Sequence, residues 1–332
     1  MTAAGFNPAE LSFPAAHVAR GHALHLLTEA DQAIERLVGG RSDDVEAVHD
    51  YRVALRRLRS WLRSFGRTMG VRSKINHRIA RRAAASASAR DTEVCLALMR
   101  TYAEELPAVP RSVLNRHLAV EEQRILEGRQ ALVRTAPDGW VGDREKILTA
   151  LVQGGNGAAT EPFIGVFADV MQRAAERLDR RMREQSTPEE MHRTRIEVKN
   201  LRYLIEPAQG VMLAASGIVT RLRELQDTHG SLNDHEVLLR YLGDAISAVA
   251  EQQATAMYQI SSDDDYEPAA YAALRRSDPA PALAAITRIV ASRHRELFES
   301  LLAAAERHEG FRPSVLAMFD PPAAIGDRAL AS

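Results

Sequence analysis

Arginine and histidine recur in one stretch of this chain at the spacing of a single helix face. The stretch is VHDYRVALRRLRSWLRSFGR, residues 48–67, and it holds six arginines and one histidine. At about 100° per residue on a helix, five of these side chains share a sector of roughly 80°: His49, Arg52, Arg56, Arg59 and Arg63. Because the planar guanidinium group binds phosphate oxygens in pairs, the pattern predicts a site for a phosphate-rich anion.

The other side of the same helix is apolar, so the helix is predicted to bury one face and present the other. The apolar set is Tyr51, Leu55, Leu58, Trp61, Leu62 and Phe65. Arg57 lies at the margin between the two faces and is counted as a further ligand candidate.

A charged helix face is most often simply solvated, and this alternative has to be weighed. Like charges four residues apart repel, as Arg52 and Arg56 do, and so do Arg59 and Arg63. An ordinary solvated face mixes the two signs, whereas a bound anion would turn the repulsion into attraction. The recurrence of the same arrangement later in the chain favours anion binding.

That recurrence has a fixed offset of 143 residues. Six residues of the first stretch (His49, Arg52, Val53, Arg56, Leu58, Arg59) return as His192, Arg195, Ile196, Lys199, Leu201 and Arg202. The same offset carries Asp91, Glu93, Val94 and Leu96 onto Asp234, Glu236, Val237 and Leu239. Two motifs in one register predict two copies of one helical unit.

The second copy presents a similar cationic stripe made of His192, Arg195, Lys199 and Arg202. Glu206 stands where the first copy has Arg63, so the second stripe is expected to be weaker at that end. Thr187, Pro188 and Glu190 predict a capping box at the start of this helix. Residues 42–44 (Ser, Asp, Asp) supply cap candidates for the first copy.

Two further basic faces are secondary candidates for ligand contact. One comprises Lys74, Arg78, Arg81 and Arg82, and the other Arg173, Arg177, Arg180 and Arg181.

Catalytic, metal and cofactor chemistry find little support in the sequence. His49 is followed by an aspartate but His192 by an arginine, which counts against a metal-dependent phosphohydrolase, and each histidine is expected to donate to an anion or to cap its stripe. Asp91 and Asp234 are interpreted as structural residues at helix starts. No phosphate loop, nucleophile elbow or paired carboxylates stand out, so we expect no enzyme activity, no metal and no cofactor.

The elements that must position these residues are predicted to be helices almost throughout. In the first half the expected helices are 9–38, 44–65, 71–89, 92–104, 111–134 and 143–153. In the second half they are 162–185, 188–206, 211–228, 235–252 and 281–307. The glycine-rich run 154–160 is interpreted as a linker, which predicts halves at 9–153 and 161–307 and a tail at 308–332. The acidic run 263–265 lacks the ligand spacing of a calcium loop and is interpreted as a solvated loop.

Composition describes a globular protein whose partners cannot be inferred from total charge. The chain has 332 residues, of which 45% are hydrophobic and 26% charged, and its formal net charge is −1. It shows no signal peptide and no apolar run of membrane-spanning length, and Cys95 is its single cysteine, so a cytoplasmic location without membrane association is expected.

The two histidine motifs resemble those of the CHAD family, the conserved histidine α-helical domain. The resemblance rests on VHDYRVALRRLRSWL, on MHRTRIEVKNLRYLIE and on LQDTHGSLNDHEVL, and it spans about residues 10–307. It implies an all-α fold of two four-helix bundles related by a pseudo-twofold axis, with the two histidine-bearing helices lining a basic groove. It also implies inorganic polyphosphate as the ligand and an association with polyphosphate granules.

Two other functions compete with polyphosphate binding. A nucleic-acid-binding protein could use the same stripes, but the near-neutral total charge and the lack of aromatic side chains among the arginines count against it. An enzyme acting on phosphate esters through the two histidines ranks third, because no metal site or nucleophile accompanies them.

Overall fold

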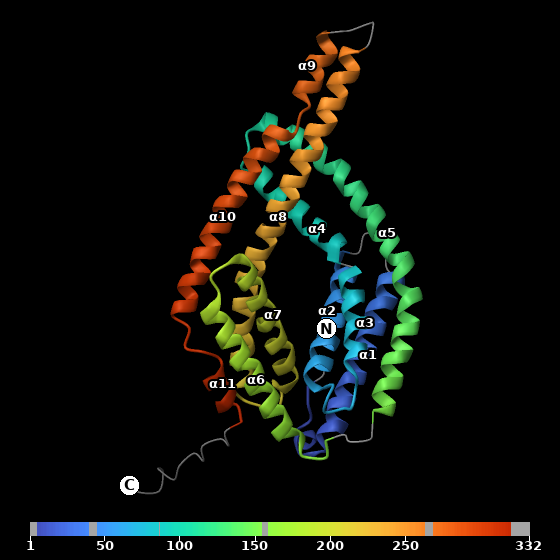
Figure 1. Cartoon of the computed structure of the whole chain (residues 1–332), viewed down its shortest axis with the longest axis vertical. Helices are drawn as coiled ribbons and strands as arrows, with labels where there is room; N and C mark the ends of the chain where they lie inside the picture. The colour runs from blue at the N-terminus through green and yellow to red at the C-terminus, as the bar shows by residue number, and fades with distance from the viewer. Residues whose placement is uncertain (1–4, 40–44, 86, 155–158, 263–267, 320–332) are drawn as a thin grey trace, which may run out of the picture.

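The computed structural model describes residues 5–39, 45–85, 87–154, 159–262 and 268–319, and its regular elements are all helices (Figure 1). The α-helices are α1 (Ala15–Gly39), α2 (Val45–Phe65), α3 (Ser73–Ala85), α4 (Ala87–Ala103), α5 (Ala108–Gln153), α6 (Phe163–Glu184), α7 (Pro188–Ile205), α8 (Ala215–Ser261), α9 (Pro268–Arg276), α10 (Ala280–Glu306) and α11 (Arg312–Ala317). Two short 3-10 helices, η1 (Pro8–Ser12) and η2 (Glu206–Ala208), complete the set. The all-α prediction is confirmed.

The helices form two groups that touch each other along their inner sides. In one group α1 packs on α2 and α5, and α3 lies between α2 and α5; in the other, α7 packs on α6 and α8, and α8 packs on α10. Contacts of α1 with α6 and of α2 with α7 join the groups. Figure 1 shows the long helices α5, α8 and α10 converging at the end where α9 lies.

The hydrophobic core extends across both groups. Trp61 and Phe65 of α2 lie in one cluster with Phe163 and Phe167 of α6, and the ring centroids of Phe65 and Phe163 are 5.9 Å apart. A second cluster joins α4 and α5 to α8 and α10. Each half therefore completes part of the other's core. The division at 154–160 stays a prediction, and residues 155–158 lie outside the described residues.

Helix boundaries differ from the sequence-based expectation in several places. The segment predicted as helices 111–134 and 143–153 is one continuous helix, α5, which runs through Pro137. Likewise α8 replaces the predicted helices 211–228 and 235–252. Packing along their length overrides the local helix-breaking signals that suggested a stop. The expected helix 9–38 is interrupted, because Phe13 before Pro14 adopts an extended conformation, as residues before proline prefer.

Part of the segment predicted as a tail belongs to the fold. The Asp179 carboxylate accepts hydrogen bonds from the backbone N–H groups of Phe311 and Arg312 at 2.7 and 2.9 Å. Phe311 and Val315 are buried, so α11 is packed against α6. The cap candidates at 42–44, the acidic run 263–265 and the segment from residue 320 onward lie outside the described residues.

Within the described ranges, no helix combines the length and the apolar character that crossing a membrane requires.

Candidate functional site

Helix α2 is oriented as its amphipathic pattern predicts. Its six predicted apolar side chains are all buried, and the indole N–H of Trp61 donates to the backbone carbonyl of Ala19 at 2.8 Å. Burying such a face contributes about 1.5–3 kcal/mol for each large side chain, which fixes the rotation of the helix. The arginines on the opposite side are thereby turned toward α7 and α4.

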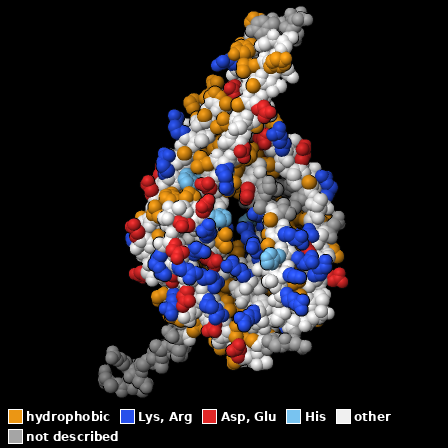
Figure 2. Space-filling view, viewed as in Figure 1, with side chains coloured by type: hydrophobic (Ala, Val, Ile, Leu, Met, Phe, Trp, Pro, Cys, Tyr) orange, Lys and Arg blue, Asp and Glu red, His pale blue; other side chains and the backbone are white. Residues whose placement is uncertain are grey.

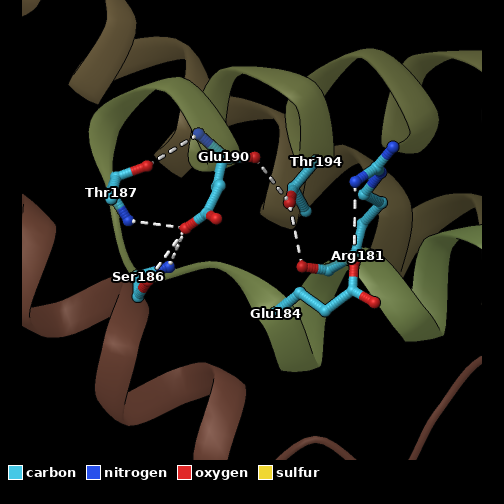
Figure 3. A network of polar contacts seen from close by, with 6 residues as sticks. All are labelled: Arg181, Glu184, Ser186, Thr187, Glu190 and Thr194. Atoms are coloured by element: carbon cyan, nitrogen blue, oxygen red, sulfur yellow. Dashed lines mark hydrogen bonds and ion pairs between the residues drawn. The ribbon is translucent and has the colours of Figure 1, made fainter.

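Helix α7 begins at the predicted capping box, which the structure confirms (Figure 3). The Thr187 hydroxyl accepts from the Glu190 N–H at 3.2 Å, and the Glu190 carboxylate accepts from the Thr187 N–H at 3.0 Å. The Thr194 hydroxyl, one turn later, donates to the backbone carbonyl of Arg181 on α6. These bonds hold the first two turns of α7, on which His192 and Arg195 stand.

A hollow of about 730 Å³ lies where α2 and α7 face α4, α8 and α10. Figure 2 shows Lys and Arg side chains gathered around a recess in the middle of this face. The predicted candidates that line the hollow are Arg52, Arg56, His192 and Arg195. The structure thus brings both histidine-bearing helices to one cavity.

Lys199 lies next to this cluster in an unfavourable electrostatic environment. Its pKa is lowered from 10.5 to about 7, first by burial and then by the positive charges of Arg195 and Arg56, whereas the charge of Asp234 acts in the opposite direction. Burial also lowers the pKa of Arg195, and the Arg195 Nε is buried without a hydrogen-bond partner. In the described part of the chain, neither residue forms an ion pair with a carboxylate. The positive charges of Arg56, Arg195 and Lys199 therefore lie close together and repel one another.

Arg57 and Arg202, by contrast, are neutralised by carboxylates of the protein itself. Arg57 lies 3.6 Å from Glu29 and 3.5 Å from Glu206, and both carboxylates are buried. Arg202 donates to the same Glu206 at 2.6 Å, and its guanidinium lies 4.7 Å from the ring centroid of Tyr203. Glu206 therefore does more than weaken one end of the second stripe, because it forms ion pairs with both Arg57 of α2 and Arg202 of α7.

Arg63 is also paired, with a carboxylate of the opposite group. Its guanidinium lies 3.2 Å from Glu197 of α7, and Arg177 of α6 lies 3.5 Å from the same carboxylate. Arg63, Arg173 and Arg177 line a small separate pocket of about 300 Å³. Arg173 lies 3.7 Å from Asp169 within α6.

Some of the secondary candidates form ion pairs and others are exposed. On α3, Arg78 and Arg82 both bind Asp143 of α5, at 3.3 and 2.8 Å, and thereby fasten α3 to α5. On α6, Arg181 lies 3.5 Å from Glu184. The side chains of Lys74, Arg81 and Arg180 are exposed. Lys74 lines another hollow, between α3 and α5, together with Arg72 and Lys146.

Besides Arg63, two other candidates of the first stripe lie outside the hollow's lining. His49 is half-buried near the start of α2, and Arg59 is exposed farther along the helix.

The interpretation of Asp91 and Asp234 as helix-start residues is wrong. Asp91 lies inside α4 and Asp234 lies in the middle of α8, and both line the central hollow. Their charges act on Arg195 and oppose its deprotonation. The repeat of Asp91 as Asp234 was the signal available in the sequence, but the expected helix breaks assigned both residues to helix ends.

Sequence reasoning also missed several polar residues of α8 and α10 that line the hollow, namely His229, Asn233, Glu236, Arg240 and His294. His294 lies 3.2 Å from Glu236, and His229 is buried and bonded to Gln185 at 3.1 Å. His229 and Asn233 fall between the predicted helices 211–228 and 235–252. Glu236 and Arg240 lie in the second of these helices, which was given no binding role, and His294 lies in a helix with no recognised motif. Among the described side chains, no three His, Cys, Asp or Glu residues are placed to hold a metal ion together.

Solved structures with the same fold are found in a plant and a bacterium. The crystal structure of the CHAD domain from the plant Ricinus communis matches with a TM-score of 0.60 and 20% identity, over 95% of this chain and 96% of that one. PptA from Streptomyces chartreusis matches with a TM-score of 0.59 and 15% identity, over 89% of this chain and 100% of that one. At these identities the likeness shows the fold.

The family itself is shown by the sequence match. No curated protein matches the sequence. The model of the CHAD domain matches residues 22–243, which is more than half of the chain and includes both histidine motifs and the residues of α2, α4, α7 and α8 that line the hollow. The chain belongs to the CHAD domain family.

Proposed function

We propose that this protein binds inorganic polyphosphate in the hollow between α2 and α7 and does not catalyse its turnover. The observation that carries the proposal is the cluster of Arg56, Arg195 and Lys199, which places like charges together in a half-buried position where no described carboxylate forms an ion pair with them. Removing a charge from water is costly unless an opposite charge accompanies it. An anion in the hollow would supply that charge.

The cluster favours a ligand with several closely spaced negative charges over a single small anion. Arg52 and Arg56 approach the hollow from α2, and His192 and Arg195 approach it from α7. One phosphate could not neutralise cations contributed by both helices, whereas a chain of phosphates could contact each in turn. Arginine's paired donors suit phosphate oxygens, and binding would release counterions from the polyanion.

A polyphosphate fits the lining better than a nucleic acid does. Proteins that bind single strands stack bases on aromatic side chains. Among the described residues that line the hollow, none is Phe, Tyr or Trp. Tyr203, next to Arg202 on α7, is buried against arginine and offers no exposed ring face.

Family membership agrees with this proposal, since the resemblance of the two histidine motifs implies polyphosphate as ligand. We extend the proposal to association with polyphosphate granules, where long chains would be available to a protein with an open hollow.

The test is a titration of the purified protein with long-chain polyphosphate, single-stranded RNA and duplex DNA at one moderate salt concentration, with released phosphate measured in parallel. We expect polyphosphate to bind tightest and no phosphate to be released. Equal affinity for the three polymers would refute selective binding, and turnover of polyphosphate would refute a purely binding role.

A further inference from the structure

The ring of His192 is held by a short chain of polar contacts that ends on a carboxylate. Its Nδ1 lies 2.8 Å from Oδ1 of Asn233, and Nδ2 of Asn233 donates to Oδ1 of Asp234 at 3.4 Å. All three residues line the central hollow. The contacts join α7, which carries His192, to α8, which carries the other two residues.

The chain of contacts fixes which nitrogen of the ring carries a proton. An ionised carboxylate only accepts hydrogen bonds, so the amide NH₂ of Asn233 must face Asp234 and its carbonyl oxygen must face His192. That oxygen is an acceptor, so Nδ1 must be the donor. In the neutral ring Nε2 is then left as an acceptor, which a phosphate oxygen would not contact favourably. Only the protonated ring can donate through Nε2.

We propose that Asn233 is a positioning residue that commits His192 to donate to a bound polyanion only in its protonated form. The inference rests on the proposed function, because it assigns a role to His192 in that same site. Without Asn233 the ring could rotate or change tautomer and offer an N–H to the ligand while neutral. With Asn233 in place, binding at His192 requires a proton.

Cations on three helices face the space around His192. Arg52 and Arg56 reach the hollow from α2, Arg193 and Arg195 from α7, and Arg240 from α8. A polyanion in the hollow would neutralise these charges and contact the ring together with them.

Carboxylates and two further histidines face the same space. Asp91 comes from α4, Glu189 from α7, and Asp234 and Glu236 from α8. His294 lies 3.2 Å from Glu236, and burial lowers the pKa of His229, which favours the neutral form of that ring.

The contact between His192 and Asn233 is specific to the second copy of the motif. The residue 143 positions before Asn233 is Arg90, so the partner of His192 has no equivalent in the first copy, although Asp234 does in Asp91. His49 is therefore not constrained in the same way by this position.

The first test needs no ligand. The ¹⁵N chemical shifts of the His192 ring, measured by NMR on the free protein, report the neutral tautomer directly. We expect the proton on Nδ1 in the wild type and a mixture of tautomers in Asn233→Leu. A wild-type ring with its proton on Nε2 would overturn the inference, whether or not the protein binds polyphosphate.

The second test measures affinity for long-chain polyphosphate from pH 5.5 to pH 8.5 at constant ionic strength. At the acid end Asn233→Leu should bind about two- to tenfold more weakly, the range expected for one hydrogen bond, and its affinity should vary less with pH. In a His192→Gln background the same substitution should have no effect.

A conservative variant separates positioning from a general loss of packing. Asn233→Asp keeps an acceptor oxygen for Nδ1 and should keep a pH-dependent affinity, displaced to higher pH because the added carboxylate favours the protonated ring. An Asn233→Leu protein with the wild-type pH profile, or an undiminished effect of Asn233→Leu without His192, would overturn the proposal. Failure of the wild type to bind polyphosphate at any pH would instead refute the proposed function and leave the tautomer result standing.

Discussion

Neighbouring basic residues on α2, and likewise on α7, have different environments. Arg56 and Arg57 are consecutive on α2, yet Arg56 lines the hollow and Arg57 is held between the buried carboxylates of Glu29 and Glu206. On α7, Lys199 has no carboxylate within ion-pair distance among the described residues, and Arg202, one turn later, is bound by Glu206.

The difference shows that the placement of carboxylates, more than the number of arginines, decides which cations are available to a ligand. Glu29, Glu197 and Glu206 neutralise one part of the cationic surface, and Glu197 and Glu206 also join the two groups of helices. The rest is left with excess positive charge around a cavity. We call the first set, Arg57, Arg63 and Arg202, the paired arginines. We call the second set, Arg56, Arg195 and Lys199, the hollow cations.

Reversing two hollow cations should have the largest effect. The double variant Arg56→Glu, Lys199→Glu places negative charge where the polyanion is proposed to bind, and we expect its affinity for polyphosphate to fall by roughly a thousandfold or more. Both side chains point away from the apolar faces of their helices, so helicity measured by circular dichroism should not change.

The matched control is Lys74→Glu, Arg180→Glu, which alters the net charge equally at two exposed positions, one in each half. This variant should bind within about tenfold of the wild type, since exposed charges contribute little individually. Similar losses in the two variants would mean that total charge, and not the hollow, governs binding.

Removing a paired arginine should affect stability before it affects binding. Arg57→Met leaves Glu29 and Glu206 buried with less compensation, and we expect the free energy of unfolding to fall by about 3 kcal/mol. Arg56→Met removes a charge repelled by its neighbours and should leave stability unchanged or raise it. Urea denaturation measures the free energy of unfolding of both variants. An equal decrease in both would contradict the distinction between a paired arginine and a hollow cation on α2.

A smaller effect concerns pH. Because the pKa of Lys199 is about 7 in the folded chain and 10.5 normally, the unfolded chain binds more protons between these values, and this residue's contribution to stability rises with pH across that window. Polyanion binding should reverse the shift, so binding at pH 8 should take up a proton and affinity should fall as pH rises above 7, by at most about tenfold per unit.

Calorimetry in buffers of different ionisation enthalpy measures that uptake. In Lys199→Arg the uptake above pH 7 should disappear, because arginine stays protonated. Unchanged uptake in this variant would assign the proton to another group. Proton uptake by His192 would persist in the Lys199→Arg variant, and the Asn233→Leu variant distinguishes it from uptake by Lys199.

Much of this arrangement could be predicted from local pattern. The apolar face of α2 and the capping box of α7 were predictable because both depend on residues within a few turns of one helix. The stripes were also predictable as surfaces, since helical spacing alone places Arg52 with Arg56 and His192 with Arg195.

What could not be predicted depends on contacts between distant segments. Nothing near Arg57 in the sequence indicates that Glu29 and Glu206 flank it, and Asp143 lies 61 residues from Arg82. The role of Asn233 depends on α8 being one helix, whereas local signals near residue 230 suggested a break. Ion pairs and long helices are decided by packing, which helical periodicity does not report.

The most direct test uses the fact that only three of the 43 basic residues are lysines. Lys199 lies beside the hollow, and Lys74 and Lys146 line a different hollow between α3 and α5. Reductive methylation with ¹³C keeps their charge and gives three probes for NMR. On titration with polyphosphate, the Lys199 signal should shift first and its pKa should rise from about 7, while Lys74 and Lys146 stay nearly unchanged. Shifts of Lys74 and Lys146 with an unaltered Lys199 would contradict the claim that the hollow cations bind the polyanion.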